Sequence, residues 1–321
     1  MRRRQFLQLA GAIFLASRST AALSETPTAP QLTLPESDKQ LLKFGLVTDI
    51  HYADNDTYGA PGEEFYEVYR HALPKFRQVI DLFNTQSLDF AIELGDFKDC
   101  VSPQNHEQTI DFLKQVEDEF AKFKGDRYHV AGNHDFDAIS PQDFLACTQN
   151  AGDANGKLYY TFVKNGIRFI VLDACYTDAT GKGVHFSHNN FTWDIANIPD
   201  EEIDWLRAVL KSDDKPIVVF THQTLDYFDP EMAKAKVIVQ NAEPVVKALE
   251  DSGRVLAVFS GHHHPGRYNF RNGIHYFTTK ALVEWPLPHN ACATVTIDKD
   301  LNIYVEGMYD AVSRRLNKAH A

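Results

Sequence analysis

Five clusters of carboxylate, imidazole and amide side chains each follow a short apolar run that is typical of a buried strand. In chain order, the clusters are Asp49-Ile50-His51, Gly95-Asp96-Phe97-Lys98-Asp99, Gly132-Asn133-His134-Asp135, Thr221-His222-Gln223 and Gly261-His262-His263-His264. Open α/β sheets place their sites at the carboxyl ends of strands, so one fold can bring all five clusters together. This mixture of oxygen and nitrogen ligands suits two divalent metal ions.

The first half of the chain alternates strand patterns with helical patterns. Strand patterns cover 43–48, 89–94 and 127–131, and amphipathic helical spacing covers 63–83 and 103–123. A kink is expected at Pro74, inside the first of these helices. Strand, ligand loop and helix in repetition predict parallel pairing with right-handed crossovers.

The second half has a different, strand-rich pattern. It predicts a hairpin of 158–163 and 167–172, short helices at 203–210 and 244–250, and buried strands at 216–220 and 255–259. Successive antiparallel strands are then expected at 274–278, 293–297 and 302–306. Because each half supplies strands that end in ligands, we expect an α/β sandwich of two sheets with helices outside.

The composition is compatible with one large soluble domain. The chain has 321 residues, 44% of them hydrophobic, which is enough for a single extended core. The formal net charge of −12 disfavours general nucleic-acid binding, so no such partner is expected. A negatively charged protein can still bind a small phosphorylated substrate where metal ions supply positive charge.

The first 22 residues have the three parts of a bacterial export signal. Arg2-Arg3-Arg4 precedes an apolar stretch at 9–16 and small residues at 19–22. Two arginines followed by Xaa-Phe-Leu resemble the twin-arginine signal, which implies contact with the export machinery and a periplasmic or secreted location. The apolar stretch is too short to span a bilayer, so stable membrane insertion is not expected. The alternative is a merely basic N-terminus.

These features predict one folded domain with short flanking segments. The expected divisions are the signal at 1–22, a flexible spacer at 23–42, the domain at 43–310 and a C-terminal tail at 311–321. Cleavage near Ala22 would remove four arginines and no acids, which changes the formal net charge from −12 to −16. The sequence does not fix the cleavage site.

The spacing of the four cysteines matches no zinc knuckle. They are Cys100, Cys147, Cys175 and Cys292. An oxidising compartment would allow three disulfide pairings, and the sequence does not choose among them. Cys175 and Cys292 lie in apolar strand-like runs and are interpreted as buried thiols.

The five clusters, in this order, resemble the motifs of the calcineurin-like metallophosphoesterase family. The resemblance covers about residues 44–307 and implies a four-layer α/β/β/α sandwich of two mixed β-sheets flanked by helices. It implies a first metal bound by Asp49, His51 and His264, a second bound by Asn133, His222 and His262, and a bridging Asp96. The cofactors would be two divalent ions, with Mn, Fe, Zn and Co left open.

The same resemblance implies a dinuclear metal-dependent phosphohydrolase of phosphoester or phosphoanhydride bonds, in which a metal-bridging hydroxide attacks phosphorus. His134 would not bind metal but would stabilise the developing charge and protonate the leaving oxygen. Asp99 would orient His134, and Asp135 would support the turn. Purple acid phosphatases have a tyrosine at the position of Asp99, so an Fe(III)–tyrosinate site is not expected.

Further phrases resemble the branch that contains the manganese-dependent ADP-ribose/CDP-alcohol diphosphatases and their bacterial phosphohydrolase relatives. They include the segment from Asp49 to Asp54, Tyr69-Arg70 and the segment from Val171 to Cys175. This closer resemblance implies a nucleoside diphosphate linked to a small alcohol or sugar as substrate. Arg70 would neutralise a second phosphate and Tyr52 would stack on a base, although helix surface and core filling explain them equally well.

Three alternatives stay open at this point. The protein could be an exported, broad-specificity phosphomonoesterase, because related sites are re-tooled for different substrates. It could be a non-catalytic metal-binding module on the same fold, although such proteins usually lose ligands or the site histidine, and His134 is present here. It could also be a mononuclear hydrolase, against which the two full ligand sets argue.

Overall fold

Two six-stranded sheets form the centre of the protein in the computed structural model, which describes residues 32–61, 63, 65–151, 156–188, 190 and 192–319. The first sheet contains, in spatial order, β14 (Arg314–Leu316), β13 (Ile303–Tyr309), β12 (Ala291–Asp298), β1 (Gln40–Val47), β4 (Phe90–Glu93) and β5 (Asp126–His129). The second contains β10 (Arg267–Arg271), β11 (Ile274–Thr278), β9 (Val255–Ser260), β8 (Ile217–Phe220), β7 (Ile167–Val171) and β6 (Tyr160–Lys164).

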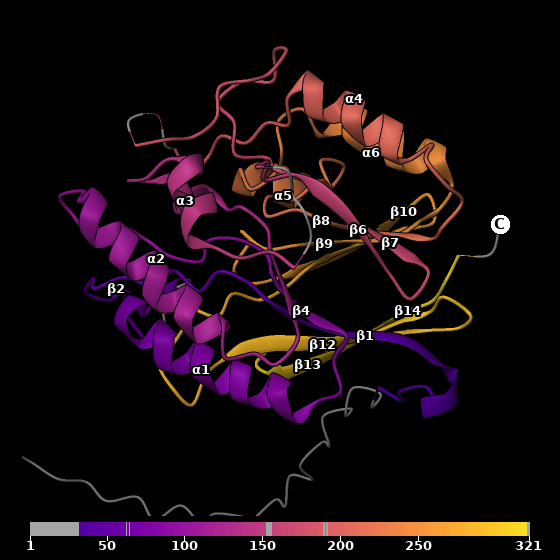
Figure 1. The fold of residues 1–321 in the computed structure, drawn as a ribbon, viewed down its shortest axis with the longest axis horizontal. Coiled ribbons are helices and arrows are strands. Elements are labelled where there is room, and N and C mark those ends of the chain that lie inside the picture. Colours follow the sequence, from indigo (N-terminus) through magenta and orange to yellow (C-terminus); the bar gives the residue numbers. More distant parts are fainter. Residues whose placement is uncertain are drawn as a thin grey trace, which may run out of the picture. The chain divides into compact units, whose positions relative to one another are not determined.

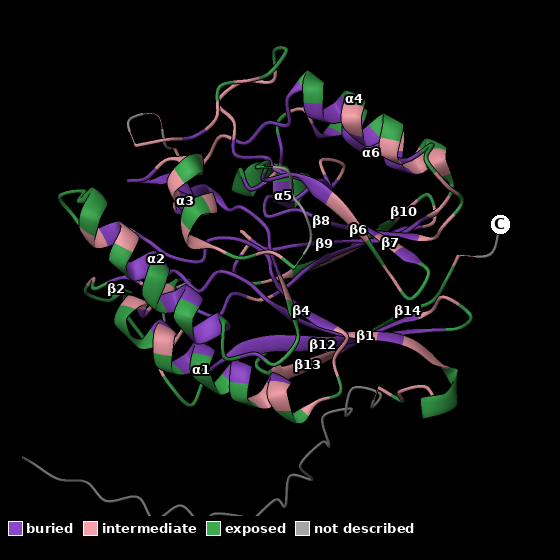
Figure 2. Ribbon diagram, in the orientation of Figure 1, coloured by how far each residue is buried: buried purple, intermediate pink, exposed green. Residues whose placement is uncertain are grey.

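Helices cover the outer faces of both sheets. The first sheet is covered by α1 (Tyr69–Thr85) and α2 (His106–Phe120), and the second by α4 (Asp200–Val209) and α6 (Ala242–Ser252) (Figure 1). Buried strands lie inside, and the helices expose residues on their outer sides (Figure 2). Shorter helices are α3 (Pro141–Cys147) and α5 (Pro230–Ala235), and single 3₁₀ turns are η1 (Ser37–Lys39) and η2 (Asn133–Phe136). The predicted four-layer α/β/β/α fold is confirmed.

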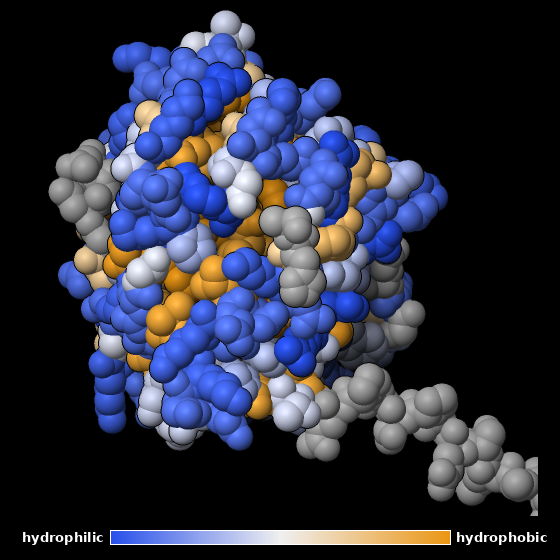
Figure 3. Space-filling view, turned by 90° about the vertical axis from the view of Figure 1, so that its right-hand side faces the viewer, coloured by the Kyte–Doolittle hydropathy of each residue, from blue (hydrophilic) through white to orange (hydrophobic). Residues whose placement is uncertain are grey.

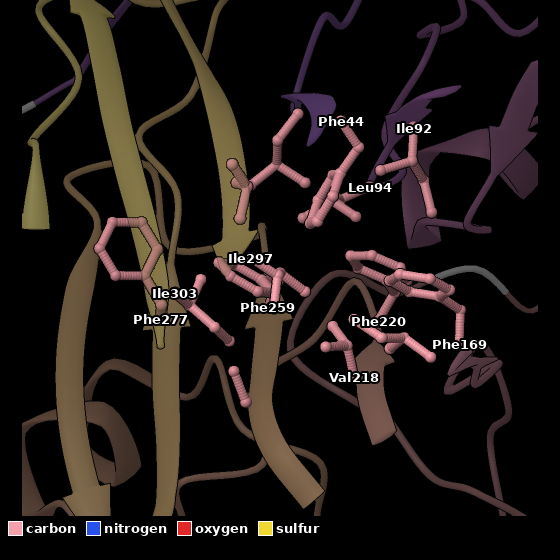
Figure 4. Close-up of a cluster of buried hydrophobic side chains, with 14 of the residues drawn as sticks. Phe44, Ile92, Leu94, Phe169, Val218, Phe220, Phe259, Phe277, Ile297 and Ile303 are labelled. Carbon is pink, nitrogen blue, oxygen red and sulfur yellow. The ribbon is translucent and has the colours of Figure 1, made fainter. Parts of the chain in front are cut away.

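Alternating side chains along each strand create these layers. In β1, Phe44 and Leu46 belong to the core between the sheets, whereas Val47 packs in the cluster that includes residues of α1 and α2. The ring of Phe44 meets the rings of Phe169 and Phe220 edge-on, at 5.9 and 5.8 Å between ring centroids. Figure 4 shows these side chains meeting between the two sheets. This aromatic core holds the sheets together beneath the strand ends.

Parallel pairing is present in both sheets, as the alternating pattern predicted. The parallel neighbours are β1, β4 and β5 in the first sheet and β7, β8, β9 and β11 in the second. The expectation that the last three strands are successive antiparallel neighbours is confirmed for β12 and β13 but was wrong for β11. β11 is parallel to β9, while β12 and β13 belong to the other sheet. Adjacent apolar runs indicate strands, but the sheet that each joins depends on long-range register.

The helix predicted from residue 63 begins six residues later. α1 starts at Tyr69 because Tyr66 and Glu67 form β3, which pairs with β2 (Tyr58–Gly59) in a small antiparallel sheet. Pro74 lies inside α1 as expected. The apolar spacing that suggested an earlier start includes Phe65, which is 37% exposed and does not belong to the helix.

The fold extends beyond both predicted domain boundaries. β1 begins at Gln40, inside the predicted spacer, and β14 lies inside the predicted tail. Leu316 in β14 is only 1% exposed and belongs to the core between the sheets. An isolated leucine among charged residues gives no strand signal, and only its pairing with β13 buries it. The predicted signal at 1–22 and the spacer up to residue 31 lie outside the described residues.

All four cysteines are free thiols, and Cys175 and Cys292 are buried as predicted. Within the described part of the chain, no helix is both long and apolar enough to cross a bilayer. The face shown in Figure 3 is largely hydrophilic, with hydrophobic residues visible between the hydrophilic ones. Among the described residues, exposed aromatic side chains include Tyr58 and Trp193.

Candidate metal centre

The turns that follow the central strands carry the predicted metal ligands. Asp49 follows β1, Asp96 follows β4, and His262 follows β9. All three have left-handed backbone conformations, with φ of 53°, 53° and 64°, and His51 does too, with φ of 47°. Residues with a Cβ rarely occupy this region and do so where the surrounding structure holds them. These turns therefore combine local strain with inward-facing ligands.

Hydrogen bonds between neighbouring loops hold the strained turns. The backbone N–H of Asp49 donates to the carbonyl of Gly95 at 3.1 Å, and that of His51 donates to the carbonyl of Asp96 at 2.9 Å. The N–H of His262 donates to the carboxylate of Asp49 at 3.1 and 3.2 Å. The loops after β1, β4 and β9 thus hold one another, across both sheets.

The first predicted ligand set lies together and is buried. Ligand atoms of Asp49, His51 and His264 all lie within 4.8 Å of one another. The Nε2 atoms of His51 and His264 each lie 3.7 Å from Asp49 Oδ1. These separations are too long for hydrogen bonds and are compatible with a cation between the groups.

The second predicted set meets the first at Asp96. Ligand atoms of Asp96, His222 and His262 also lie within 4.8 Å of one another. Asp96 Oδ2 lies 3.0 Å from His222 Nε2 and 3.4 Å from Nε2 of His51, which belongs to the first set. Asp96 therefore stands where a bridging carboxylate would have to stand.

Hydrogen bonds at Nδ1 orient three of the imidazoles. The acceptors are Asp99 Oδ1 for His51 at 3.1 Å, Leu94 O for His222 at 2.7 Å and Glu284 Oε1 for His264 at 2.7 Å. A ring that donates through Nδ1 keeps a lone pair on Nε2 for a metal. The Nε2 atoms of His51 and His222 are buried and have no hydrogen-bond partner. Because buried polar atoms are normally satisfied, these two nitrogens fit metal ions.

The acids of the centre are held in their ionised form. Burial opposes ionisation of Asp49, but the neighbouring His51, His222 and His264 lower its pKa to about 2. The pKa of Asp96 is likewise well below its ordinary value, because nearby imidazoles outweigh burial. In contrast, burial and the neighbouring His222 lower the pKa of His262 to about 3, so His262 is neutral. The same acids raise the pKa values of His51, His222 and His264 despite their burial, so metal binding at these imidazoles would release protons.

Asn133 needs one adjustment to act as a ligand. Its Oδ1 accepts a hydrogen bond of 3.1 Å from Gln223 Nε2, while Asn133 Nδ2 and Gln223 Oε1 are buried without partners. Turning over both amides preserves this hydrogen bond and presents the Asn133 carbonyl oxygen in place of the unpartnered Nδ2. The amide pair therefore fits the predicted role of Asn133.

The predicted catalytic pair is present. Asp99 Oδ1 lies 2.7 Å from His134 Nδ1, and the same oxygen accepts from His51. Burial opposes protonation of His134, but Asp99 and Asp96 raise its pKa to about 9. The pKa of Asp99 is correspondingly lowered, since His134 and His51 outweigh its burial. Asp99 therefore contacts both a predicted metal ligand, His51, and the predicted catalytic histidine, His134.

Comparison with known proteins agrees with this geometry. Residues 42–266 match the calcineurin-like phosphoesterase family. The chain belongs to this family. As a calcineurin-like phosphoesterase it is a metal-dependent phosphoric ester hydrolase that binds two divalent metal ions.

Several relatives carry the name manganese-dependent ADP-ribose/CDP-alcohol diphosphatase. The one from Xenopus laevis is 24% identical over 307 residues, covering 80% of this chain and 85% of the relative. The one from Oryza sativa subsp. japonica is 25% identical over 300 residues, covering 82% and 90%. A dimetal phosphatase from Danio rerio shares the fold, with a TM-score of 0.74, 19% identity and coverage of 87% of this chain and 100% of that chain.

Buried polar groups support the metallophosphoesterase loop that carries His134. Asp135 accepts hydrogen bonds from the backbone N–H groups of Asp96, Phe97 and Gly132, as its predicted supporting role requires. A Cβ on Gly132 would lie 2.1 Å from the backbone nitrogen of Asp96, so only glycine permits this close approach.

A buried lysine supports the same loop from the other side. Lys98 is fully buried, and its Nζ donates to the carbonyl oxygen of His134 and to Asp137 Oδ1, both at 2.5 Å. Because the pair is buried and hydrogen-bonded on both sides, removing either partner would leave an uncompensated charge. The loop that presents His134 is therefore tied to the loop after β4.

A cavity of about 500 Å³ opens beside the metal centre. His51, Asp96, His134, His262 and His264 reach it from the centre. The rest of its lining is mostly aromatic or apolar, with a single carboxylate among the described residues. The additional lining residues are Tyr58, Phe65, Glu67, Tyr69, Trp193, Ala235, Val237 and His263.

The two predicted substrate residues do not line this cavity. Arg70 is exposed and pairs with Asp54 and Asp56, so its charge is already balanced. Tyr52 donates from its hydroxyl to Gln115 Oε1 at 2.9 Å and packs against helix α2. In the pair Tyr69-Arg70, the tyrosine lines the cavity and the arginine points elsewhere, since neighbouring helix positions face different directions.

Sequence reasoning missed Glu284 and the aromatic part of the cavity. Glu284 orients His264, yet it has no motif context and lies 20 residues beyond it. Tyr58 lies in β2, whereas Phe65 and Trp193 lie in loops, and the three share no spacing that could have linked them. His263, expected to be structural or substrate-facing, does line the cavity.

Replacing Glu284 should weaken metal binding without unfolding the protein. Glu284→Ala removes the acceptor that holds His264 Nδ1, and loss of such outer partners typically lowers metal affinity 10–100-fold. Glu284→Gln should have a smaller effect, because an amide oxygen still accepts. Calorimetric titration with Mn²⁺ measures both, with Glu250→Ala as a control, since Glu250 pairs with Arg271 on another part of the surface. Unchanged affinity in Glu284→Ala would remove His264 from the ligand set.

Proposed function

We propose that the protein is a manganese-dependent diphosphatase that cleaves the P–O–P bond of nucleoside diphosphates linked to a small alcohol or sugar. The two diphosphatase relatives named above, which each match at least 80% of this chain, support this assignment. The observation that carries it is the cavity of about 500 Å³ that adjoins both ligand sets. That volume suits a nucleotide-sized ligand and exceeds what an isolated phosphate needs.

The chain's own residues have defined parts in this reaction. When bound, the two divalent ions polarise the phosphate oxygens and activate the attacking water. Asp99 holds His134 at Nδ1, so a proton for the leaving oxygen would come from His134 Nε2. Lys98 and Asp135 fix the loop that carries His134, which keeps the ring in place during turnover.

A panel of substrates tests this function. The Mn²⁺-loaded protein, with and without EDTA, is given ADP-ribose, CDP-choline, p-nitrophenyl phosphate, bis-p-nitrophenyl phosphate and 2′,3′-cyclic AMP. We expect the highest kcat/KM for ADP-ribose or CDP-choline and no turnover with EDTA. Preference for p-nitrophenyl phosphate would instead identify a broad-specificity phosphomonoesterase. Absence of metal-dependent turnover with Mn²⁺, Fe²⁺ or Zn²⁺ would contradict the assignment and favour a binding module.

His134→Ala should separate chemistry from metal binding. We expect unchanged metal content and a kcat about 10²–10⁴-fold lower, the usual scale for loss of a general acid. Asp96→Asn is the matched comparison, because loss of the bridging charge should remove at least one metal ion and nearly all activity. Metal analysis and steady-state kinetics on the same preparations measure both. Loss of metal from His134→Ala would show that His134 is a ligand.

We also propose that the protein is exported to the periplasm through the twin-arginine route. The support is the three-part pattern of residues 1–22, which lie outside the described residues. Replacing Arg3 and Arg4 together by lysine should leave the protein in the cytoplasm of a bacterial host. Arg18→Lys is the control. Equal periplasmic yield from both variants, measured after cell fractionation, would contradict this route.

A further inference from the structure

One wall of the cavity beside the metal centre consists largely of aromatic side chains, which do not suit a phosphate group. Four aromatic side chains line it, and we call Tyr58, Phe65, Tyr69 and Trp193 the aromatic wall. Among the described residues that line the cavity, none is lysine or arginine. A wall of this kind gives no cationic contact to an anion, so the phosphates must be bound on the side of the metal ligands.

Three rings of the aromatic wall are exposed to solvent and are not part of the hydrophobic core. Tyr58 is 63%, Trp193 52% and Phe65 37% exposed, so these rings contribute little to the core. The ring of Phe65 lies 6.0 Å from that of His264, between ring centroids. Exposed aromatic groups gathered at a cavity are typical of ligand contact rather than of packing. The wall therefore reaches from solvent to the edge of the metal centre.

A carboxylate stands among these rings. Glu67 in β3 lies directly opposite Tyr58 in β2, and its Oε2 accepts a hydrogen bond of 2.5 Å from the hydroxyl of Tyr69. Its Oε1 is 3.5 Å from His264 Nδ1, but Glu284 holds that nitrogen more closely, at 2.7 Å. Within the described residues, no lysine or arginine forms an ion pair with Glu67. A negative charge is thus left at the aromatic wall.

We propose that the aromatic wall and Glu67 bind a positively charged ammonium group of the substrate. Aromatic faces attract cations through their quadrupole, and a neighbouring carboxylate adds direct charge attraction. The same carboxylate repels a further phosphate, which places the ammonium group on the alcohol that is esterified to the diphosphate and that departs as its phosphate ester when the P–O–P bond breaks. Glu67, Phe65 and Trp193 then determine specificity for amino-alcohol esters. This inference rests on the proposed function, because it places the diphosphate at the metal centre.

A matched pair of substrates isolates the positive charge. CDP-choline is compared with CDP-3,3-dimethylbutanol, in which a carbon replaces the ammonium nitrogen and the shape is retained. We expect kcat/KM for CDP-choline to be at least about tenfold higher, a factor within the range of cation–π and charge contacts. Glu67→Gln and Trp193→Leu should each reduce this ratio severalfold. Trp193 is half-exposed, so its replacement should not disturb folding.

The ratio of kcat/KM for the two substrates distinguishes ammonium binding by Glu67 from a purely structural role. If Glu67 merely braces His264, Glu67→Gln will lower activity on both substrates equally and reduce Mn²⁺ content. That result, or equal kcat/KM for the two substrates in the wild-type protein, would overturn the inference and leave the diphosphatase assignment intact.

A complete lack of hydrolysis would instead overturn the diphosphatase assignment. Calorimetric titration of the Mn²⁺-loaded protein with phosphocholine and with 3,3-dimethylbutyl phosphate then decides the inference. Preference for phosphocholine that is lost in Trp193→Leu supports it. Equal binding, or no binding of either compound, contradicts it.

Discussion

Two buried carboxylates at the ends of neighbouring strands are the constraint on which the site depends. β1 and β4 pair in parallel, with Val47 opposite Glu93, so Asp49 and Asp96 emerge from the sheet beside each other. Two buried carboxylates in neighbouring turns would be unfavourable without compensating positive charge. The imidazoles that surround them place unpartnered nitrogens in the same space, and two divalent ions satisfy acids and imidazoles together. The metal centre is therefore a consequence of strand register.

Hydrogen bonds from neighbouring residues to the imidazole Nδ1 atoms fix the orientation of the predicted ligands. Asp99 is shared by His51, a predicted metal ligand, and by His134, the predicted general acid. The orientations of the two imidazole rings therefore depend on the same carboxylate oxygen. Glu284 and the carbonyl of Leu94 fix two further rings in the same way. The N–H hydrogen bonds between the neighbouring loops hold the strained turns with positive φ at the ends of the strands.

The two sides of the cavity differ in chemistry, and this difference bears on selectivity. One side carries the metal ligands and suits anionic oxygen, whereas the other carries exposed aromatic rings and Glu67. The predicted ligands on the first side lie within residues 42–266, the segment that matches the family. The second side comes from the small sheet of β2 and β3 and from the loop that carries Trp193. Substrate preference in such a protein is decided by loops around a common centre.

The sequence alone determined the sandwich of two sheets and the order of the ligand clusters, and its resemblance to the family implied the pairing of Asp99 with His134. These features could be predicted because buried strands, amphipathic helices and ligand spacings are local patterns. The tertiary structure decided which sheet β12 and β13 join, that Leu316 belongs to the core, and that Glu284 supports His264. It also decided that Tyr69 rather than Arg70 faces the cavity. Each of these depends on contacts between residues far apart in the chain, or on the direction of one side chain, and neither leaves a periodic trace in the sequence.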